Sequence, residues 1–193
     1  VSCGQCLVSC PFGANVDKSQ IYQVIRSILE GNEVVAIVAP SFVGQFGKDV
    51  TVPKFLTAMK QLGFSDVVEV AAGADICTIE EAHDFMEKVP LEQRFMATSC
   101  CPSWRMMARR LFPAESGNIS MTYTPMVYTA RLVKKEHPNS KVVFIGPCAA
   151  KKLEAMQEDI RTDVDFVLTY EELMGIFEAK EINFSTLPDS PDL

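Results

Sequence analysis

The sequence lacks several features that would assign it to a common class of protein. No apolar stretch approaches the roughly 20 residues that a bilayer-spanning helix needs. Positive charge is not in excess, because 18 Lys and Arg stand against 25 Asp and Glu, a net charge of −7. The chain does not open with a basic segment followed by an apolar one, and it contains no internal repeats. We therefore expect a cytoplasmic protein that binds neither membrane nor nucleic acid.

The chain has seven cysteines, most of them clustered, and the last is Cys148. Six of them form three groups, which are Cys3/Cys6/Cys10, Cys100/Cys101 and Cys148. In an intracellular protein such grouping favours metal or redox chemistry over a disulfide framework. Cys77 stands alone in an apolar segment, and we expect it to be an ordinary buried side chain.

The chain of 193 residues is 48% hydrophobic, enough to bury a core, and it alternates apolar runs with amphipathic segments. This alternation predicts an α/β fold, with a parallel sheet or sheets covered by helices on both faces. Expected strands cover residues 34–39, 67–70, 95–98, 141–145 and 166–168. Expected helices cover residues 18–30, 53–62, 79–88, 103–111, 125–136 and 170–179.

The distribution of turn-forming residues suggests how the chain is divided. Residues 1–14 stand apart as a cysteine-rich segment, and residues 15–193 form the main domain. Residues 112–124, with Pro, Gly, Asn and Ser, are expected to join two lobes of that domain. The tail, residues 183–193, is expected to be exposed or poorly ordered.

The N-terminal cysteines have the spacing C-x2-C-x3-C-P over Cys3, Cys6 and Cys10-Pro11. This spacing matches the last three cysteines of a bacterial ferredoxin run, which reads C-x2-C-x2-C-x3-C-P. A zinc site is the alternative, because a C-x2-C pair supplies two of the four ligands of a structural zinc ion. We interpret residues 1–14 as the remnant of a ferredoxin-like 4Fe-4S domain.

Two further motifs each follow an expected strand. The first is Thr98-Ser99-Cys100-Cys101-Pro102 with Trp104, and the second is Gly146-Pro147-Cys148-Ala149-Ala150-Lys151-Lys152. Taken alone, the double cysteine could be a pair of buried small side chains in a turn. Together, the two segments closely resemble the first two signature motifs of the iron-only (FeFe) hydrogenases, and the resemblance covers nearly the whole chain.

This resemblance implies roles for individual residues. In the family, a 4Fe-4S cubane is linked through one cysteine to a two-iron subsite, and the whole is the H-cluster. Cys101 and Cys148 would be two of the four cubane ligands, and Cys100 would carry protons beside the two-iron subsite. Lys151 would donate a charge-assisted hydrogen bond to a cyanide ligand. Ala39, Pro40 and Ser41 resemble the segment that lines the dithiolate pocket, and residues 3, 6 and 10 would hold the ferredoxin-type cluster.

A proton relay is the least specific part of the resemblance. Glu81 and Asp84 lie three residues apart on an expected helix and match the two acidic positions of the family relay. Ser120 matches its serine. The alternative is a solvated acidic helix face with Glu80 and Glu81.

The chain also departs from the family pattern. Gly146 replaces the usual methionine of the second motif, and Met126 replaces a pocket glutamine. The third motif, which supplies the other two cubane cysteines, has no counterpart. The resemblance therefore implies part of an anaerobic oxidoreductase that reversibly reduces protons to dihydrogen, with ferredoxin or another redox protein as partner. We expect these residues alone to be inactive, to lack a complete metal centre and to self-associate through the exposed cluster face. The alternatives are a hydrogenase-like iron–sulfur assembly protein and a dihydrogen sensor.

Overall fold

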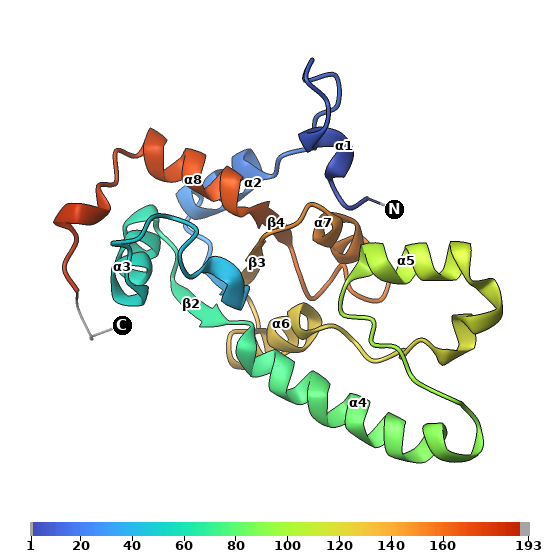
Figure 1. Ribbon diagram of the computed structural model, residues 1–193. Coiled ribbons are helices and arrows are strands. Elements are labelled where there is room, and N and C mark those ends of the chain that lie inside the picture. The colour runs from blue at the N-terminus through green and yellow to red at the C-terminus, as the bar shows by residue number, and fades with distance from the viewer. Residues whose placement is uncertain (1, 190–193) are drawn as a thin grey trace.

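The computed structural model describes residues 2–189 and has one parallel sheet of four strands in the order β2-β1-β3-β4 (Figure 1). The strands are β1 (Val34–Val38), β2 (Asp66–Glu69), β3 (Lys141–Gly146) and β4 (Phe166–Thr169). Helices cover both faces, so the α/β fold predicted from the sequence is confirmed. Since β1 pairs with both β2 and β3, the direction of winding reverses between β1 and β3.

The composition of β1 explains its central position. All five residues, Val-Val-Ala-Ile-Val, are buried. Val34, Ala36 and Val38 contribute to one hydrophobic cluster, and Val35 and Ile37 to the other. Successive side chains of a strand point to opposite faces, so a strand between two helical layers must be apolar at every position.

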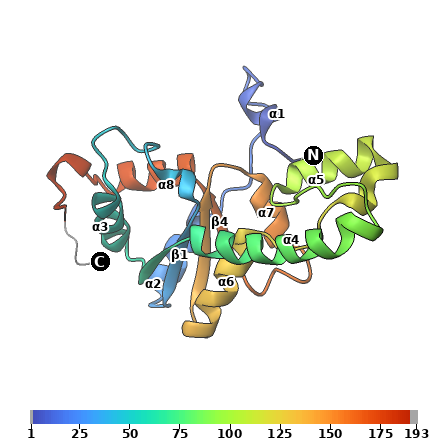
Figure 2. The ribbon, with the colours of Figure 1, turned by 60° about the horizontal axis from the view of Figure 1, so that its bottom comes forward.

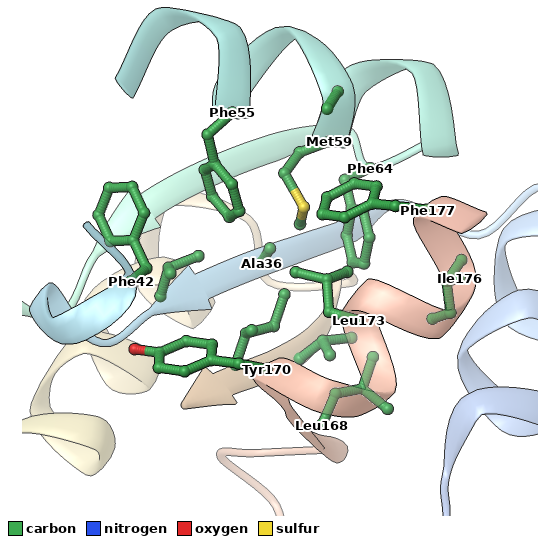
Figure 3. Packing of buried hydrophobic residues seen from close by; sticks show 14 of the residues in the cluster. Ala36, Phe42, Phe55, Met59, Phe64, Leu168, Tyr170, Leu173, Ile176 and Phe177 are labelled. Atoms are coloured by element: carbon green, nitrogen blue, oxygen red, sulfur yellow. The ribbon is translucent and has the colours of Figure 1, made fainter. Parts of the chain in front are cut away.

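The helices divide between the two faces of the sheet. On one face α2 (Ile21–Leu29), α3 (Val52–Leu62) and α8 (Tyr170–Ala179) surround a cluster that includes Phe55, Leu173 and Phe177 (Figure 3). On the other face α6 (Pro125–Glu136) contributes Met126, Val127, Ala130 and Val133. The remaining elements are α1 (Gln5–Val8), α4 (Ala71–Leu91), α5 (Pro102–Leu111) and α7 (Ala150–Ala155), with 3-10 turns η1 (Pro40–Phe42), η2 (Pro113–Asn118) and η3 (Phe184–Thr186).

Several helices begin where the sequence supplies a capping residue. Thr51 accepts a hydrogen bond from the Lys54 amide at the start of α3. Thr169 and Glu172 form a reciprocal capping box at the start of α8. Proline occupies one of the first two positions of α3, α5 and α6, where its missing N–H costs nothing.

The expected strand at residues 95–98 is wrong. Within the described chain this segment joins no sheet, and Ala97 forms only an isolated parallel bridge with Ile119. Phe95 is exposed, so the apolar run is not the buried run of a central strand. A run of three apolar residues does not by itself distinguish a strand from a connecting segment.

Two other boundaries differ from expectation. The helix expected at residues 79–88 is longer, because α4 starts at Ala71 directly after β2 and runs to Leu91. The tail is not wholly exposed, since η3 forms at residues 184–186 and Leu187 is buried. Residues 190–193 lie outside the described part.

Helix α4 connects the sheet to a projecting part of the molecule. Its first turns pack on α6, where a Cβ atom at Gly73 would overlap Thr129 Oγ1 and the Pro125 carbonyl. The rest of α4 extends away from the sheet, and α5 projects on the same side of the molecule (Figure 2). No helix in residues 2–189 combines the length and hydrophobicity required to cross a membrane.

Candidate active site

A pocket of about 260 Å³ lies at the carboxyl ends of the strands. Ala39 and Ser41 follow β1, Val70 follows β2, and Pro147 and Cys148 follow β3. In open α/β sheets, ligands bind at this edge, in the crevice where the winding reverses. The wall is completed by Phe144 of β3 and by residues from outside the sheet, which are Cys100, Cys101, Pro102, Pro125, Met126 and Lys151.

The loop after β1 is held by a buried tyrosine. The Tyr170 hydroxyl donates to the Ala39 carbonyl oxygen at 3.0 Å and lies 2.8 Å from Ser41 Oγ. Burial raises the pKa of the Tyr170 phenol, so it remains a neutral donor. Ala39 and Ser41 therefore line the pocket, whereas Pro40 is exposed and lies outside its lining.

The double cysteine reaches the pocket from the start of α5. Cys101 is the N-cap residue, and its Sγ accepts a hydrogen bond from the Trp104 amide at 3.5 Å. A helix N-terminus favours negative charge, which suits a thiolate. Cys100 and Cys101 are both exposed free cysteines.

Cys148 enters from the other side of the pocket. It follows β3, and its Sγ accepts a hydrogen bond from the Ala150 amide at 3.4 Å. Cys101 and Cys148, which are 47 positions apart in sequence, therefore line one pocket. The sequence led us to expect these two cysteines at neighbouring strand ends, but only Cys148 follows a strand of the sheet.

Lys151 joins the two sides of the pocket. Its Nζ donates to the Cys100 carbonyl oxygen at 3.1 Å and to Glu154 Oε2 at 2.6 Å. The Glu154 side chain is only 1% exposed, and Lys151 is the partner that compensates its buried charge. Sequence reasoning missed Glu154, although its spacing of three residues from Lys151 on a helix is a usable signal.

The neighbouring Lys152 points elsewhere. It is buried and its Nζ donates to Asp17 Oδ2 at 2.5 Å, to Glu172 Oε1 at 2.9 Å and to the Lys18 carbonyl oxygen at 3.2 Å. Helix α7 thus holds the active-site loop through Lys151 and the N-terminal connection through Lys152.

The N-terminal cysteines lie beside the pocket. Cys3 and Cys6 line a second cavity of about 390 Å³ together with Ala149, Lys152 and Leu153. The Cys3 carbonyl oxygen is 4.0 Å from Cys148 Sγ. Backbone amides, chiefly that of Ala14 and then that of Phe12, lower the pKa of the Cys10 thiol. Among residues 2–189 no three His, Cys, Asp or Glu side chains converge closely enough to hold a metal ion.

The predicted relay residues lie outside the pocket lining. Glu81 and Asp84 both lie on α4, and Asp84 forms a salt bridge of 3.0 Å with Lys88. Ser120 is buried and its Oγ donates to Thr122 Oγ1 at 3.1 Å. Cys77 is buried as expected and donates to the Tyr123 carbonyl oxygen at 3.4 Å. Burial, followed by the nearby charge of Glu81, raises the pKa of Cys77 to about 11.

The two residues that depart from the family pattern both bear on the pocket. Met126 is buried and lines it directly. A Cβ atom at Gly146 would lie 2.5 Å from the Phe144 ring, which is itself part of the wall. Phe144 therefore fills the space that a side chain at position 146 would need.

The donor chemistry of the pocket fits an iron–sulfur centre. Cys100, Cys101 and Cys148 supply three soft thiols, and Lys151 supplies one ammonium donor within a largely apolar wall. A cubane takes four thiolates, so the two assigned here are half of a ligand set.

Comparison with known proteins gives a consistent result. The family described as "Iron only hydrogenase large subunit, C-terminal domain" matches residues 32–193. Iron hydrogenase 1 of Clostridium pasteurianum is 34% identical over 93% of this chain and 35% of its own length. The cytosolic Fe-S cluster assembly factor NAR1 of Phaeosphaeria nodorum is 31% identical over 58% of this chain and 21% of its own length. The structure of an apo [FeFe]-hydrogenase from Chlamydomonas reinhardtii superposes with a TM-score of 0.77 at 26% identity, covering 89% of this chain and 50% of that one.

These matches extend over only part of each relative. The chain spans between 35% and 37% of the first two curated relatives that it matches.

Proposed function

Because this chain belongs to the family of iron-only hydrogenase large subunits, C-terminal domain, we propose that it forms part of an active centre that interconverts protons, electrons and dihydrogen. The observation that supports this proposal best is the meeting of Cys100, Cys101, Cys148 and Lys151 in one pocket at the sheet edge. When bound there, the H-cluster would supply the iron at which dihydrogen is formed or cleaved.

Each residue of the pocket has a distinct task in this proposal. Cys101 and Cys148 would hold the cubane, and the amides of Trp104 and Ala150 donate hydrogen bonds that orient their sulfur atoms. Cys100 carries a proton, since a thiol can both donate and accept one as a general acid and base. Lys151 offers its ammonium group to an anionic ligand of the two-iron subsite.

Supporting roles are assigned to residues outside the pocket and to three further residues of its wall. Cys3, Cys6 and Cys10 would hold a ferredoxin-type cluster, which would supply electron transfer to and from a redox protein. Glu81, Asp84 and Ser120 pass protons between solvent and Cys100. The surrounding Ala39, Ser41 and Met126 shape the space around the subsite.

Substitution of the two adjacent cysteines tests the proposal. In the longer parent protein, loaded anaerobically, Cys100→Ser should keep its iron while hydrogen evolution from reduced viologen falls by at least about 100-fold, because serine is too weak an acid. Cys101→Ser should lose iron, and Cys77→Ser, which lies outside the pocket, should keep both iron and turnover. Equal iron loss in the Cys100 and Cys101 variants would contradict the proposal. The 193 residues alone should show no turnover, because they supply two of the four cubane thiolates.

A scaffold for iron–sulfur assembly is the second candidate. The similarity to NAR1 and the changes at Gly146 and Met126 favour it. Such a scaffold needs Cys101 and Cys148 but neither the proton carrier Cys100 nor the ammonium of Lys151. If Lys151→Met and Cys100→Ser leave the iron content and the cluster spectrum of the loaded parent unchanged, and the unsubstituted protein shows no turnover, the scaffold is the better description.

A further inference from the structure

Tyr170 places a hydroxyl group behind the wall of the pocket. Its ring is 4% exposed and belongs to the hydrophobic cluster on the α8 side of the sheet. The ring of Phe46 packs edge-on against it, with the two centroids 5.9 Å apart. Figure 3 shows the hydroxyl at the end of the ring that points towards η1, which contains Ser41. The tight packing of the ring therefore fixes the position of its oxygen atom beside the loop after β1.

This oxygen atom lies within hydrogen-bond distance of two others. It is 3.0 Å from the Ala39 carbonyl oxygen and 2.8 Å from Ser41 Oγ. A phenol carries one proton, and a carbonyl oxygen can only accept one. The proton of Tyr170 therefore points to Ala39, and Ser41 donates its own proton to the Tyr170 oxygen. The reverse arrangement would leave the oxygen atoms of Tyr170 and Ala39 3.0 Å apart with no hydrogen between them, which is unfavourable in a buried place.

Ser41 thereby acquires a fixed hydrogen-bonding character in the pocket, whose wall it forms in part. A serine hydroxyl has one proton and two acceptor lone pairs. Because the proton is donated to Tyr170, Ser41 can accept a hydrogen bond from a bound group but cannot donate one. The ammonium group of Lys151, in the same wall, can only donate. The pocket therefore presents an acceptor at Ser41 and a donor at Lys151.

We infer that Tyr170 is a positioning residue that keeps Ser41 a hydrogen-bond acceptor towards the group bound in the pocket. The part of the bound group that lies against Ser41 then carries an N–H or O–H, while the part at Lys151 is an anionic acceptor. A hydrogen bond accepted by Ser41 also leaves more electron density on the group that donates it. This inference rests on the proposed function for the identity of the bound group, whereas the contact between Tyr170 and Ser41 does not depend on it.

Carbon-13 NMR of the Ala39 carbonyl in the 193-residue chain tests the direction of these hydrogen bonds without any metal. A carbonyl carbon signal moves upfield when its oxygen loses a hydrogen bond. Tyr170→Phe should therefore move the Ala39 signal upfield. Ser41→Ala should leave the signal nearly in place, because Ser41 donates to Tyr170 and not to Ala39. The matched control is Tyr22→Phe, which removes a phenol hydroxyl from a side chain that is 69% exposed and should not move the signal.

Infrared spectroscopy of the longer parent protein, loaded anaerobically, tests the effect on the bound group. Cyanide stretching frequencies rise when electron density at the iron falls. Ser41→Ala removes the acceptor and should therefore move the cyanide bands to higher frequency. Tyr170→Phe frees the Ser41 proton for donation into the pocket and should move the bands at least as far. Tyr22→Phe should leave them in place, and equal iron content verifies that the variants are equally loaded.

Any of three results would overturn the inference. They are an Ala39 signal that Tyr170→Phe leaves in place, an equal displacement of that signal by Ser41→Ala, and cyanide bands that Ser41→Ala moves to lower frequency or not at all. Absence of cyanide bands from the loaded parent would instead contradict the proposed function, and the Ala39 measurement would still decide the direction of the hydrogen bonds. Thermal melting of each variant verifies that it is folded.

Discussion

The two halves of this molecule are organised differently. The sheet half, residues 20–78 and 119–187, contains both hydrophobic clusters. In the arm, residues 79–118, the only described side chains that are buried are Ser99 and Ser103. Large apolar side chains of the arm are exposed instead, among them Phe85, Leu91, Leu111 and Phe112. The sheet half is thus stabilised by its own core, while the arm depends on its attachments.

The pocket lies where the two halves meet. Cys100 and Cys101 come from the arm, and Cys148 and Lys151 come from the sheet half. Within the described residues, few polar contacts fix the arm beside the sheet: the Ala97–Ile119 bridge and the hydrogen bonds from Lys151 to Cys100, from Arg105 to Gln157 and from Arg109 to the Met121 sulfur. The relative placement of the cysteines therefore depends on a small number of polar contacts.

The largest difference between the halves should appear in their response to loss of a phenylalanine. Phe55→Ala should lower the free energy of unfolding by about 4 kcal/mol, because Phe55 is 1% exposed within the aromatic cluster. Phe112→Ala, in the arm at 60% exposure, should change it by less than about 0.5 kcal/mol. Urea denaturation measures both. Similar losses in the two variants would mean that the arm is packed as tightly as the sheet half.

The attachment of the arm should depend strongly on Lys151, which forms an ion pair with Glu154 and donates a hydrogen bond to the Cys100 carbonyl oxygen. Lys151→Met leaves the buried Glu154 carboxylate without its partner and should lower the free energy of unfolding by about 3 kcal/mol at neutral pH. Amide exchange in residues 98–104 should accelerate, since the Cys100 carbonyl loses its donor.

The double variant Lys151→Met/Glu154→Gln is the control for this effect. A neutral glutamine is less costly to bury than an unpaired carboxylate, so at least half of the lost stability should return. Slow exchange in residues 98–104 of the single variant would show that other contacts hold the arm.

The sheet half could be predicted from the sequence because its signals are local and strong. The continuous apolar strands, the capping residues and the prolines at helix starts each reflect one physical requirement. The arm could not be predicted as well. The apolar run at 95–98 has the composition of a strand, yet no sheet edge is available to it, which only the tertiary structure reveals.

The candidate site likewise contains residues that the sequence predicted and residues that it did not. Motif spacing found Cys100, Cys101, Cys148 and Lys151, which the structure brings together. Glu154 and the anchoring hydroxyl of Tyr170 were missed, since neither belongs to a pattern that the sequence analysis used. The sequence analysis gave the three arginines of α5 no role, because their lack of carboxylate partners in the described chain is a property of the fold.

The thiols of the two halves provide the mildest test. Cys77 is 6% exposed on the sheet side of α4, whereas Cys100 is exposed in the arm. Alkylation requires the thiolate, and the pKa of Cys77 is raised to about 11. At about pH 8, iodoacetamide should therefore modify Cys77 at least about 100-fold more slowly than Cys100. Mass spectrometry of the modified chain measures both rates. Equal rates would mean that α4 separates from α6 readily.

The pH dependence of alkylation and of stability sharpens this test. Because the pKa of Cys77 is raised, both effects should appear as the pH rises. The folded state favours the protonated thiol of Cys77, so the resulting stabilisation is complete below the ordinary thiol pKa of 9.0 and is lost as the pH rises towards about 11. Alkylation of Cys77 should accelerate over that window, and the free energy of unfolding should fall with it. Cys77→Ser removes the titrating group while keeping a donor for the Tyr123 carbonyl, so its loss of stability over the same window should be smaller. An identical decline in that variant would assign the effect to other groups and leave the attachment of α4 independent of Cys77.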